Sequence, residues 1–311
     1  MLTSNLGLWL IFGLLGLIWG SSYLFIKIGV ESLGPFTLVS LRLLFAGTFL
    51  AIVVRISREP LPRDPRTLRH LAVVGMLSMF FPFSLITWGE LHVTSGLAAV
   101  LNATTPLFTI LVAALVLHDE PLRMNRVLGL VIGFIGVAVV ASPTLPGGLI
   151  EGDLAVAGVV AVTLSSVSYA LGAVYARRNL HGVRPMTIAL GMVSFGFLVS
   201  APLALGLERP FANGLRLEAL LSVAWLGVLG SGVALLIFYR LLASWGATRT
   251  NSVTYLIPPV GVVLGVLVLH EPLDLTIVAG TALIIAGVAL VNARQGLRRL
   301  LRRPVPVPPE A

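Results

Sequence analysis

Long runs of hydrophobic residues, separated by short polar segments, cover almost the whole chain. Ten runs are about 20 residues long, which is the length a helix needs to cross a bilayer. They occupy residues 7–29, 35–55, 68–88, 94–117, 124–141, 153–177, 186–206, 218–240, 247–269 and 275–293. Because backbone polar groups cannot be left without partners in lipid, each run is predicted to be a transmembrane helix. Glycine pairs such as Gly129 and Gly133 are spaced for close packing between these helices.

The fourth and fifth runs recur as the ninth and tenth. The segments Ser95–Val140 and Ala247–Val291 contain prolines, a charged group and glycines in the same order. The matching pairs are Pro106 and Pro258, His118 and His270, Glu120 and Glu271, Pro121 and Pro272, Gly129 and Gly280, and Gly136 and Gly287. Five crossings, an odd number, separate the copies, so the copies have opposite orientations. The pattern predicts an all-α integral membrane protein whose ten transmembrane helices form two inverted five-helix repeats, residues 7–141 and 153–293.

Composition agrees with a membrane protein. Hydrophobic residues make up 57% of the chain and charged residues 11%, whereas soluble domains carry about a quarter charged residues. Cysteine is absent, which excludes disulfides and thiolate metal sites. The net charge of +8 could indicate a nucleic-acid partner. The charges lie in short loops rather than along one polar face, however, which favours the lipid bilayer as the partner and argues against nucleic acid.

The arginines predict the orientation of the chain in the membrane. With the N-terminus in the cytoplasm, seventeen arginines lie on the cytoplasmic side and two, Arg209 and Arg216, on the outer side. This bias follows the positive-inside rule and predicts that both termini are cytoplasmic. The first run lacks a basic leader and a cleavage site, so we expect a retained helix. Residues 294–311 form a basic, proline-rich cytoplasmic tail, which either lies on anionic headgroups or serves only as a topology anchor.

Prolines inside three of the runs predict helix breaks, because a proline frees the carbonyl group four residues earlier. These prolines are Pro82, Pro106 and Pro258. Broken helices at matching depths in two halves point to a substrate site in transporters. For any single residue the alternative is a packing kink, in which a hydroxyl bonds back to its own helix. The polar residues at the breaks of the fourth and ninth runs are candidate substrate-binding residues: Asn102, Thr105, Asn251, Thr254 and Tyr255.

Related polar motifs occur in the first and sixth runs. The first contains Trp-Gly-Ser-Ser-Tyr, ending at Tyr23, and the sixth contains Ser-Ser-Val-Ser-Tyr, ending at Tyr169. We interpret Ser21 and Ser165 as contacts between helices, and the two tyrosines as cavity-facing residues.

Two basic residues lie within the runs. Lys27 is close to the outer end of the first run, so it either serves the site or extends its ammonium group to the interface. Arg42 lies about two turns into its run and cannot reach water so easily. We expect it to face protein or a wet cavity, where it binds a substrate carboxylate or pairs with a carbonyl group or with Glu31.

Sequence motifs of enzymes are missing. The chain contains no His-Glu-x-x-His and no P-loop. The two groups of His, Glu and Pro lie on opposite sides of the membrane and cannot share a metal ion. We therefore expect no enzymatic activity, no cofactor and no metal site. No acidic residue lies deep in a run, so Glu90 and Glu120 at the interfaces are the candidates for ion coupling, and downhill transport is the simpler interpretation.

The sequence resembles the drug/metabolite transporter superfamily and, within it, the EamA family. The resemblance extends over residues 10–293 and rests on W-G-S-S-Y-x-x-x-K, on S-G-L-A-A-V-L-N-A-T-T-P-L-F with H-D-E-P-L, and on G-A-T-R-T-N-S-V-T-Y-L-I-P-P. It implies a ten-helix bundle that moves small metabolites, often amino acids, out of the bacterial cytoplasm. Its implied pocket residues are Trp19, Tyr23, Phe81, Trp88, Asn102, Tyr169, Trp225 and Tyr255. The doubled Pro258-Pro259 departs from the family pattern and is expected to sharpen the ninth helix break.

We therefore expect a secondary transporter for small metabolites in the bacterial inner membrane, working by alternating access with export as the expected direction. Two other classes stay open. A membrane-embedded enzyme acting on lipid would need a nucleophile, a metal cluster or an acid pair, and a non-transporting assembly partner would carry a large apolar outer patch without a central pocket. The sequence names neither the solute nor the oligomeric state.

Overall fold

The computed structural model describes residues 5–117, 124–144, 154–208, 210 and 216–301, and in these ranges helices are joined by short turns and loops. Within these described ranges, nine segments are long and apolar enough to cross a membrane, and Leu275–Val291 is a shorter apolar helix. Each of these ten segments corresponds to one of the ten predicted runs. The prediction of an all-helical, multi-pass membrane protein is therefore confirmed.

Five of the ten spans are interrupted, and five are not. The uninterrupted spans are α1 (Asn5–Val30), α2 (Pro35–Ile56), α7 (Met124–Ala141), α8 (Ala155–Asn179) and α14 (Leu275–Leu301). The third span is α3 (Pro65–Gly75), η1 (Met76–Phe80) and α4 (Phe81–Gly89), and the fourth is α5 (Ser95–Asn102) and α6 (Thr105–Val116). The seventh is α9 (Pro185–Leu203) and η3 (Ala204–Glu208), and the eighth is α10 (Leu217–Ala224), η4 (Trp225–Val233) and α11 (Ala234–Trp245). The ninth is α12 (Ala247–Asn251), η5 (Ser252–Tyr255) and α13 (Ile257–Leu269).

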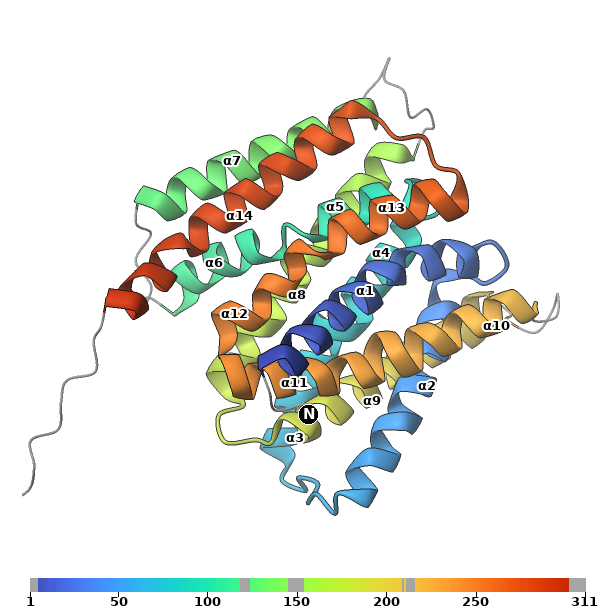
Figure 1. The fold of residues 1–311 in the computed structure, drawn as a ribbon. Helices are drawn as coiled ribbons and strands as arrows, with labels where there is room; N and C mark the ends of the chain where they lie inside the picture. Colours follow the sequence, from blue (N-terminus) through green and yellow to red (C-terminus); the bar gives the residue numbers. More distant parts are fainter. Residues whose placement is uncertain (1–4, 118–123, 145–153, 209, 211–215, 302–311) are drawn as a thin grey trace, which may run out of the picture.

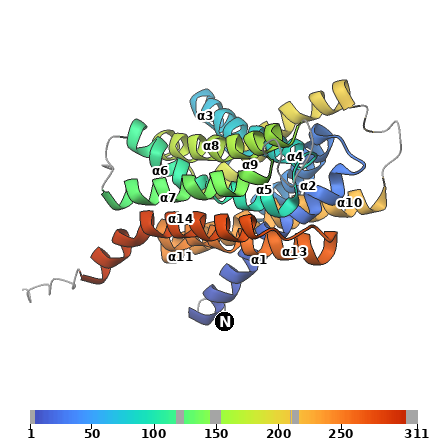
Figure 2. The ribbon, with the colours of Figure 1, turned by 90° about the horizontal axis from the view of Figure 1, so that it is seen from above.

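Corresponding helices of the two halves run in opposite directions. In Figure 1, α7 and α14 lie side by side and antiparallel, and the order α5–α6 runs against the order α12–α13. The same pairing of α7 with α14 is visible from above in Figure 2. The start of α1 and the far end of α14 lie at the same end of the bundle (Figure 1). The predicted pair of inverted repeats is confirmed.

The first helix of each half packs mainly against the other half. Helix α1 contacts α10, α11 and α13 of the second half, whereas α8, the first helix of the second half, contacts α4, α5 and α6 of the first. The remaining equivalent helices meet directly, α2 with α9 and α7 with α14. The two halves therefore share one core, and the central residues of each half depend on side chains from the other.

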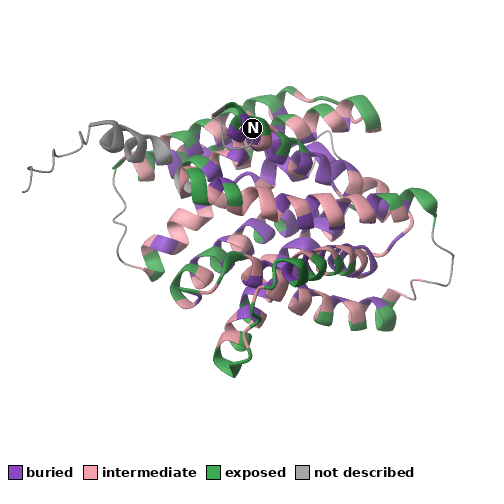
Figure 3. Cartoon of the chain, turned by 60° about the horizontal axis from the view of Figure 1, so that its bottom comes forward, coloured by how far each residue is buried: buried purple, intermediate pink, exposed green. Residues whose placement is uncertain are grey.

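Burial follows this arrangement. Residues coloured as buried gather in the middle of the bundle, and exposed ones lie towards its outside (Figure 3). Many exposed residues are large and apolar, including Leu198, Leu221 and Leu267. A water-soluble surface would not carry so many, whereas these side chains match a lipid environment.

Glycines allow the close approach of α7 and α14. A Cβ atom at Gly287 would lie 2.6 Å from the carbonyl oxygen of Gly129, and one at Gly136 would lie 2.9 Å from that of Gly280. Both distances are shorter than real Cβ contacts. The packing role expected for Gly129 is thus observed, because any side chain there would push the helices apart.

We expect the substitution Gly287→Leu to lower the melting temperature of the purified protein, because overpacking costs about 1–3 kcal/mol or more. Gly13 is the matched control, since a Cβ atom at Gly13 meets nothing within 4 Å. Thermal unfolding in detergent measures both variants. Equal melting temperatures for Gly287→Leu and Gly13→Ala would contradict the close contact of α7 with α14.

Candidate functional site

The fourth span is broken in the middle of the bundle. Helix α5 ends at Asn102, and α6 begins at Thr105 with Pro106 in its first turn. The carbonyl oxygen of Asn102 accepts hydrogen bonds from Thr105 Oγ1 at 2.7 Å and from Ser166 Oγ at 3.3 Å. The Asn102 side-chain amide donates to Ser165 Oγ at 3.1 Å. The break is thus held by α8, which belongs to the other half.

The ninth span is broken at the equivalent place, over Ser252–Tyr255, and Pro258 lies in the first turn of α13. Here the hydroxyls bond back to their own segment, since Thr254 Oγ1 donates to the carbonyl oxygen of Asn251 at 2.9 Å. Asn251 is exposed, and Tyr255 is half-buried against the core. For Thr254 this contact is the local bond expected of a packing kink.

Widened π-helical turns occur in the third and eighth spans, at η1 and η4. Ser168 of α8 donates to the carbonyl oxygen of Leu77 in η1 at 2.8 Å, and Trp19 Nε1 of α1 donates to that of Gly230 in η4 at 3.2 Å. The first helix of each half, α1 or α8, therefore donates a side-chain hydrogen bond to a π-helical segment of the opposite half. Pro82, in the first turn of α4 directly after η1, indicated a break at the first π segment, whereas η4 contains no proline and was not predicted.

The serines of the two related motifs link helices, as interpreted. Ser21 Oγ accepts a hydrogen bond from Trp225 Nε1 at 3.3 Å, and Ser165 Oγ accepts the one from Asn102. The Trp225 ring also lies 4.8 Å from the ring of Phe25, measured between centroids. Trp19 and Trp225 therefore both join α1 to the eighth span.

Arg42 lies at the centre of a buried cluster drawn from five spans. Its side chain is 5% exposed, its Nε donates to Ser231 Oγ at 3.0 Å, and its guanidinium carbon lies 3.8 Å from the centre of the Phe83 ring. The Phe83 ring in turn packs edge-on against that of Tyr169, with ring centres 6.5 Å apart, and the buried Tyr23 lies within electrostatic range of Arg42. We call Arg42, Ser231, Phe83, Tyr23 and Tyr169 the Arg42 cluster.

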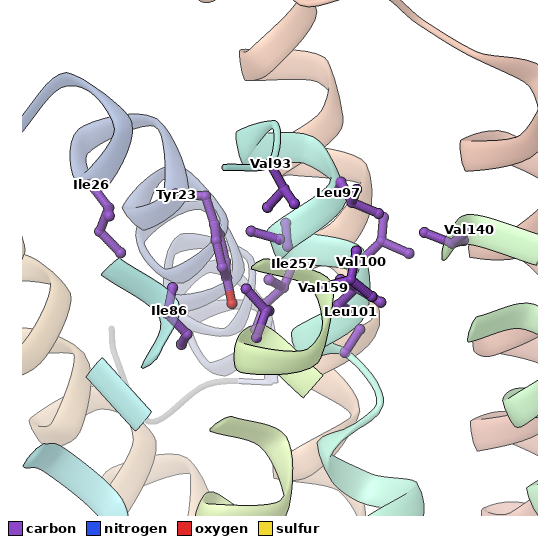
Figure 4. Close-up of a cluster of buried hydrophobic side chains, with 14 of the residues drawn as sticks. Tyr23, Ile26, Ile86, Val93, Leu97, Val100, Leu101, Val140, Val159 and Ile257 are labelled. Atoms are coloured by element: carbon purple, nitrogen blue, oxygen red, sulfur yellow. The ribbon is translucent and has the colours of Figure 1, made fainter. Parts of the chain in front are cut away.

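The Arg42 cluster has donors to spare. Among the described residues, neither terminal amino group of Arg42 has a hydrogen-bond partner, although the guanidinium group carries five N–H donors. The pairing with Glu31 considered from the sequence does not occur, because Glu31 is exposed. Figure 4 shows Tyr23 among buried aliphatic side chains, including Ile86 and Ile257. The arrangement can bind an anionic group in an otherwise apolar setting.

A second polar group joins three segments at the end of the bundle opposite to the start of α1. Lys27 Nζ donates to the backbone carbonyl oxygens of Glu90 at 2.5 Å and Val93 at 2.8 Å. Its ammonium group thus reaches the end of the bundle and binds the turn between α4 and α5, while a role of Lys27 in the site stays a prediction.

The carboxylate of Glu271 caps the N-terminus of α5. Its Oε1 accepts the backbone N–H of Ser95 at 2.7 Å, and its Oε2 accepts Ser95 Oγ at 3.0 Å and the N–H of Gly96 at 3.1 Å. An anion at a helix N-terminus is stabilised by the free N–H groups and the helix dipole. We call Lys27, Glu90, Ser95, Gly96 and Glu271 the clamp.

The clamp marks an asymmetry between the two ends of the bundle. At the clamp, α5 packs closely against α13. The equivalent of α5 in the other half is α12, and the equivalent of α13 is α6. Helices α6 and α12 make no comparable contact within the described part of the chain. Glu120, the equivalent of Glu271, and His118 lie outside the described residues.

The remaining expected residues lie apart from the Arg42 cluster. Phe81 is 43% exposed and contacts Phe80, and Trp88 packs edge-on against His92 with ring centres 4.7 Å apart. The structure also shows that Glu90 is fully buried, whereas the sequence placed it at an interface. Its position at the end of a hydrophobic run gave no signal of that burial.

Comparison with known proteins gives a family match in both halves. The sequence model of the EamA-like transporter family matches residues 6–142 and 156–293. The chain is 31% identical over 250 residues to the "Uncharacterized inner membrane transporter YedA" of Escherichia coli K12, covering 80% of this chain and 78% of that protein. It is 26% identical over 283 residues to an "Uncharacterized transporter" of Archaeoglobus fulgidus, covering 91% and 98%.

Two further similarities bear on function and fold. A "Probable terminal-alkyne amino-acid exporter" of Streptantibioticus cattleyicolor is 30% identical over 290 residues, covering 90% of this chain and 92% of that protein. One crystal structure, described only as that of a protein, superposes with a TM-score of 0.66 at 22% identity over 96% of this chain and all of that one. This last likeness concerns the fold alone.

We expect Glu271→Ala to loosen the N-terminus of α5, because three hydrogen bonds to the carboxylate are lost. The cost is about 1–2 kcal/mol, so amide exchange at Ser95 and Gly96 should accelerate ~5–30-fold. Hydrogen–deuterium exchange with mass spectrometry measures this, with the exposed Glu31→Ala as the control. Unchanged exchange in Glu271→Ala would show that the cap contributes nothing to the contact of α5 with α13.

Proposed function

Because this chain belongs to the EamA-like transporter family, we propose that it is a secondary transporter of amino acids or related small metabolites, and that it exports them across the bacterial inner membrane. Its membership in a family of transporters sets aside the alternative of a lipid-modifying enzyme. The proposed mechanism is alternating access, in which the two inverted halves exchange conformations.

The mechanism is supported mainly by the contact of α5 with α13, for which the described residues show no comparable contact between α6 and α12 at the other end. In an inverted repeat, each half can adopt the conformation of the other, which converts the structure into one open at the opposite end. The clamp closes the end that holds α5 and α13. In the exchanged state we expect α6 and α12 to approach one another and the clamp to release.

The Arg42 cluster supports an anionic or zwitterionic solute. A buried guanidinium group with free donors matches a carboxylate, and the cluster is formed by both halves. An amino acid or related compound would present that carboxylate, in keeping with the relative described as a terminal-alkyne amino-acid exporter. Residues at the two breaks, Asn102, Thr105, Asn251, Thr254 and Tyr255, and the aromatic residues Trp19, Phe81, Trp88 and Trp225 remain candidates for contacts to the rest of the solute.

The arginine distribution supports an orientation with both termini in the cytoplasm. The start of α1 and the far end of α14 lie at one end of the bundle (Figure 1), as an even number of crossings requires. The clamp then lies on the outer side of the membrane, and the described arrangement is the one closed to the outside. The match to an inner membrane transporter supports the same location.

Counterflow in proteoliposomes tests the proposal. Vesicles containing the protein are loaded with one unlabelled amino acid or metabolite from a panel and then given a trace of the same compound in labelled form. We expect accumulation above that of protein-free vesicles for at least one compound. Failure of the folded protein to exchange any compound in an amino-acid panel and a metabolite library would contradict a transport function.

We expect Arg42→Gln to impair exchange of carboxylate-bearing solutes selectively. Loss of charge-assisted hydrogen bonds worth about 1.5–3 kcal/mol should lower apparent affinity ~10–100-fold. Arg42→Lys keeps the charge without the planar fork and should be intermediate, and the exposed Arg55→Gln on the same helix is the control. An equal loss for amide analogues without the carboxylate would show structural damage instead of lost recognition.

A further inference from the structure

We propose that the carboxyl group of Glu90 is a proton-binding site that holds a proton while α5 and α13 are in contact. The proposal has two parts. The first, that Glu90 is protonated in the described arrangement, does not depend on any solute. The second, that loss of this proton accompanies opening of the clamp, rests on the proposed transport cycle.

Burial is the first observation. Glu90 is 0% exposed, the only carboxylic acid among the fully buried side chains of the described residues. It follows directly after α4, in the turn that leads to α5. Its backbone N–H donates to the carbonyl oxygen of Ile86 at 2.9 Å, and its backbone carbonyl accepts Lys27 Nζ. The backbone is thus firmly held, and the side chain points into protein.

The second observation is the lack of partners for the side chain. Among the described residues, neither Oε1 nor Oε2 of Glu90 accepts a hydrogen bond. A carboxylate removed from water without a donor is strongly disfavoured, and such groups take up a proton instead. By contrast, Glu271 in the same clamp accepts three hydrogen bonds, so its carboxyl oxygens have the donors that those of Glu90 lack.

Four charged or titratable groups on neighbouring elements lie within electrostatic range of Glu90. Lys27 and Tyr23 lie on α1, Arg42 on α2 and Glu271 after α13. The two cations favour a charged Glu90, but Lys27 gives its described hydrogen bonds to backbone carbonyls and Arg42 gives its own to Ser231. No ion pair forms with Glu90 among the described residues. The carboxylate of Glu271 opposes ionisation, as does burial.

Protonation of Glu90 is linked to opening of the clamp because the groups around Glu90 belong to different parts of the bundle. Lys27 belongs to α1, which packs on the second half, and Glu271 also belongs to the second half. Release of the clamp would separate both from the turn at Glu90 and admit water to its carboxyl group. A hydrated carboxyl group is ionised at neutral pH, so the proton would leave to the outer side.

The sign of the pH dependence follows from proton linkage. The closed arrangement binds one more proton than the open one, so a lower pH on the outer side stabilises closure and a higher pH favours opening. In the pH range where Glu90 is protonated in the closed arrangement and ionised in the open one, each pH unit should change the ratio of closed to open molecules by up to about tenfold. The clamp would thus respond to external acidity.

Infrared spectroscopy of the full-length chain in lipid nanodiscs tests the first part without any solute. At pH about 7, ordinary exposed carboxyl groups are ionised and give no C=O band of a carboxylic acid. We expect such a band in the unmodified protein, its loss in Glu90→Gln, and its retention in Glu31→Gln. Labelling the glutamates with carbon-13 should shift the band in the unmodified chain, which assigns it to glutamate even if the variant does not fold.

The absence of an acid band in the unmodified protein at this pH, or its persistence in folded Glu90→Gln, would overturn the proton site.

The second part is tested by amide exchange at Ser95 and Gly96, corrected for the intrinsic rate at each pH. We expect protection to fall as pH rises in the unmodified protein and to stay constant in Glu90→Gln, a permanently neutral mimic. Protection that does not vary with pH in the unmodified protein would overturn the link to the clamp. Failure of counterflow alone would leave the infrared result standing.

Discussion

The structure depends on one constraint, which is that backbone polar groups in lipid must find hydrogen-bond partners within the protein. At several places near its centre the chain leaves regular helix geometry. There a side chain from the opposite half donates a hydrogen bond to a backbone carbonyl group. Ser166 binds the carbonyl group of Asn102 at the break of the fourth span, and Ser168 binds that of Leu77 in η1. Trp19 does the same for Gly230 in η4. Helices α1 and α8 each pack on the opposite half, and this packing supplies the hydrogen-bond donors. The helix breaks therefore depend on the packing of α1 and α8.

The same constraint explains why the polar contacts divide into a centre and an end. At the centre, Arg42 is held by Ser231 and Phe83 with donors left over, which is a setting suited to a solute carboxylate. At the end, Glu271 satisfies the free N–H groups of α5, and this bond exists only while α13 lies beside α5. A helix cap that forms in just one arrangement of the helices links local hydrogen bonding to the overall shape of the bundle. That coupling is what a transporter working by alternating access requires.

Much of the fold could be predicted from the sequence. The ten spans, the inverted repeats and the packing role of Gly129 follow from hydrophobic runs, an odd number of crossings and glycine spacing. The site was harder to predict. The segment η4 contains no proline, and its three glycines weaken a helix without specifying a widened turn. The burial of Glu90 and the binding of Lys27 to the turn between α4 and α5 depend on neighbours from distant parts of the chain, which local patterns do not specify. Ser21 and Ser165, interpreted from the sequence as contacts between helices, do accept hydrogen bonds from Trp225 and Asn102 of other spans.

The central claim is that the two ends of the bundle open in alternation. Because the chain has no cysteine, spin labels can be placed at chosen pairs of exposed residues without background. Leu91 and Leu273 report on the end that carries the clamp, and Leu115 and Ser244 report on the opposite end. Electron–electron distance distributions in nanodiscs should show that the first pair separates as the second pair approaches, across the same pH series and with any solute found by counterflow. Distances that stay fixed at both ends, or that change in the same direction, would contradict alternating access by these inverted halves.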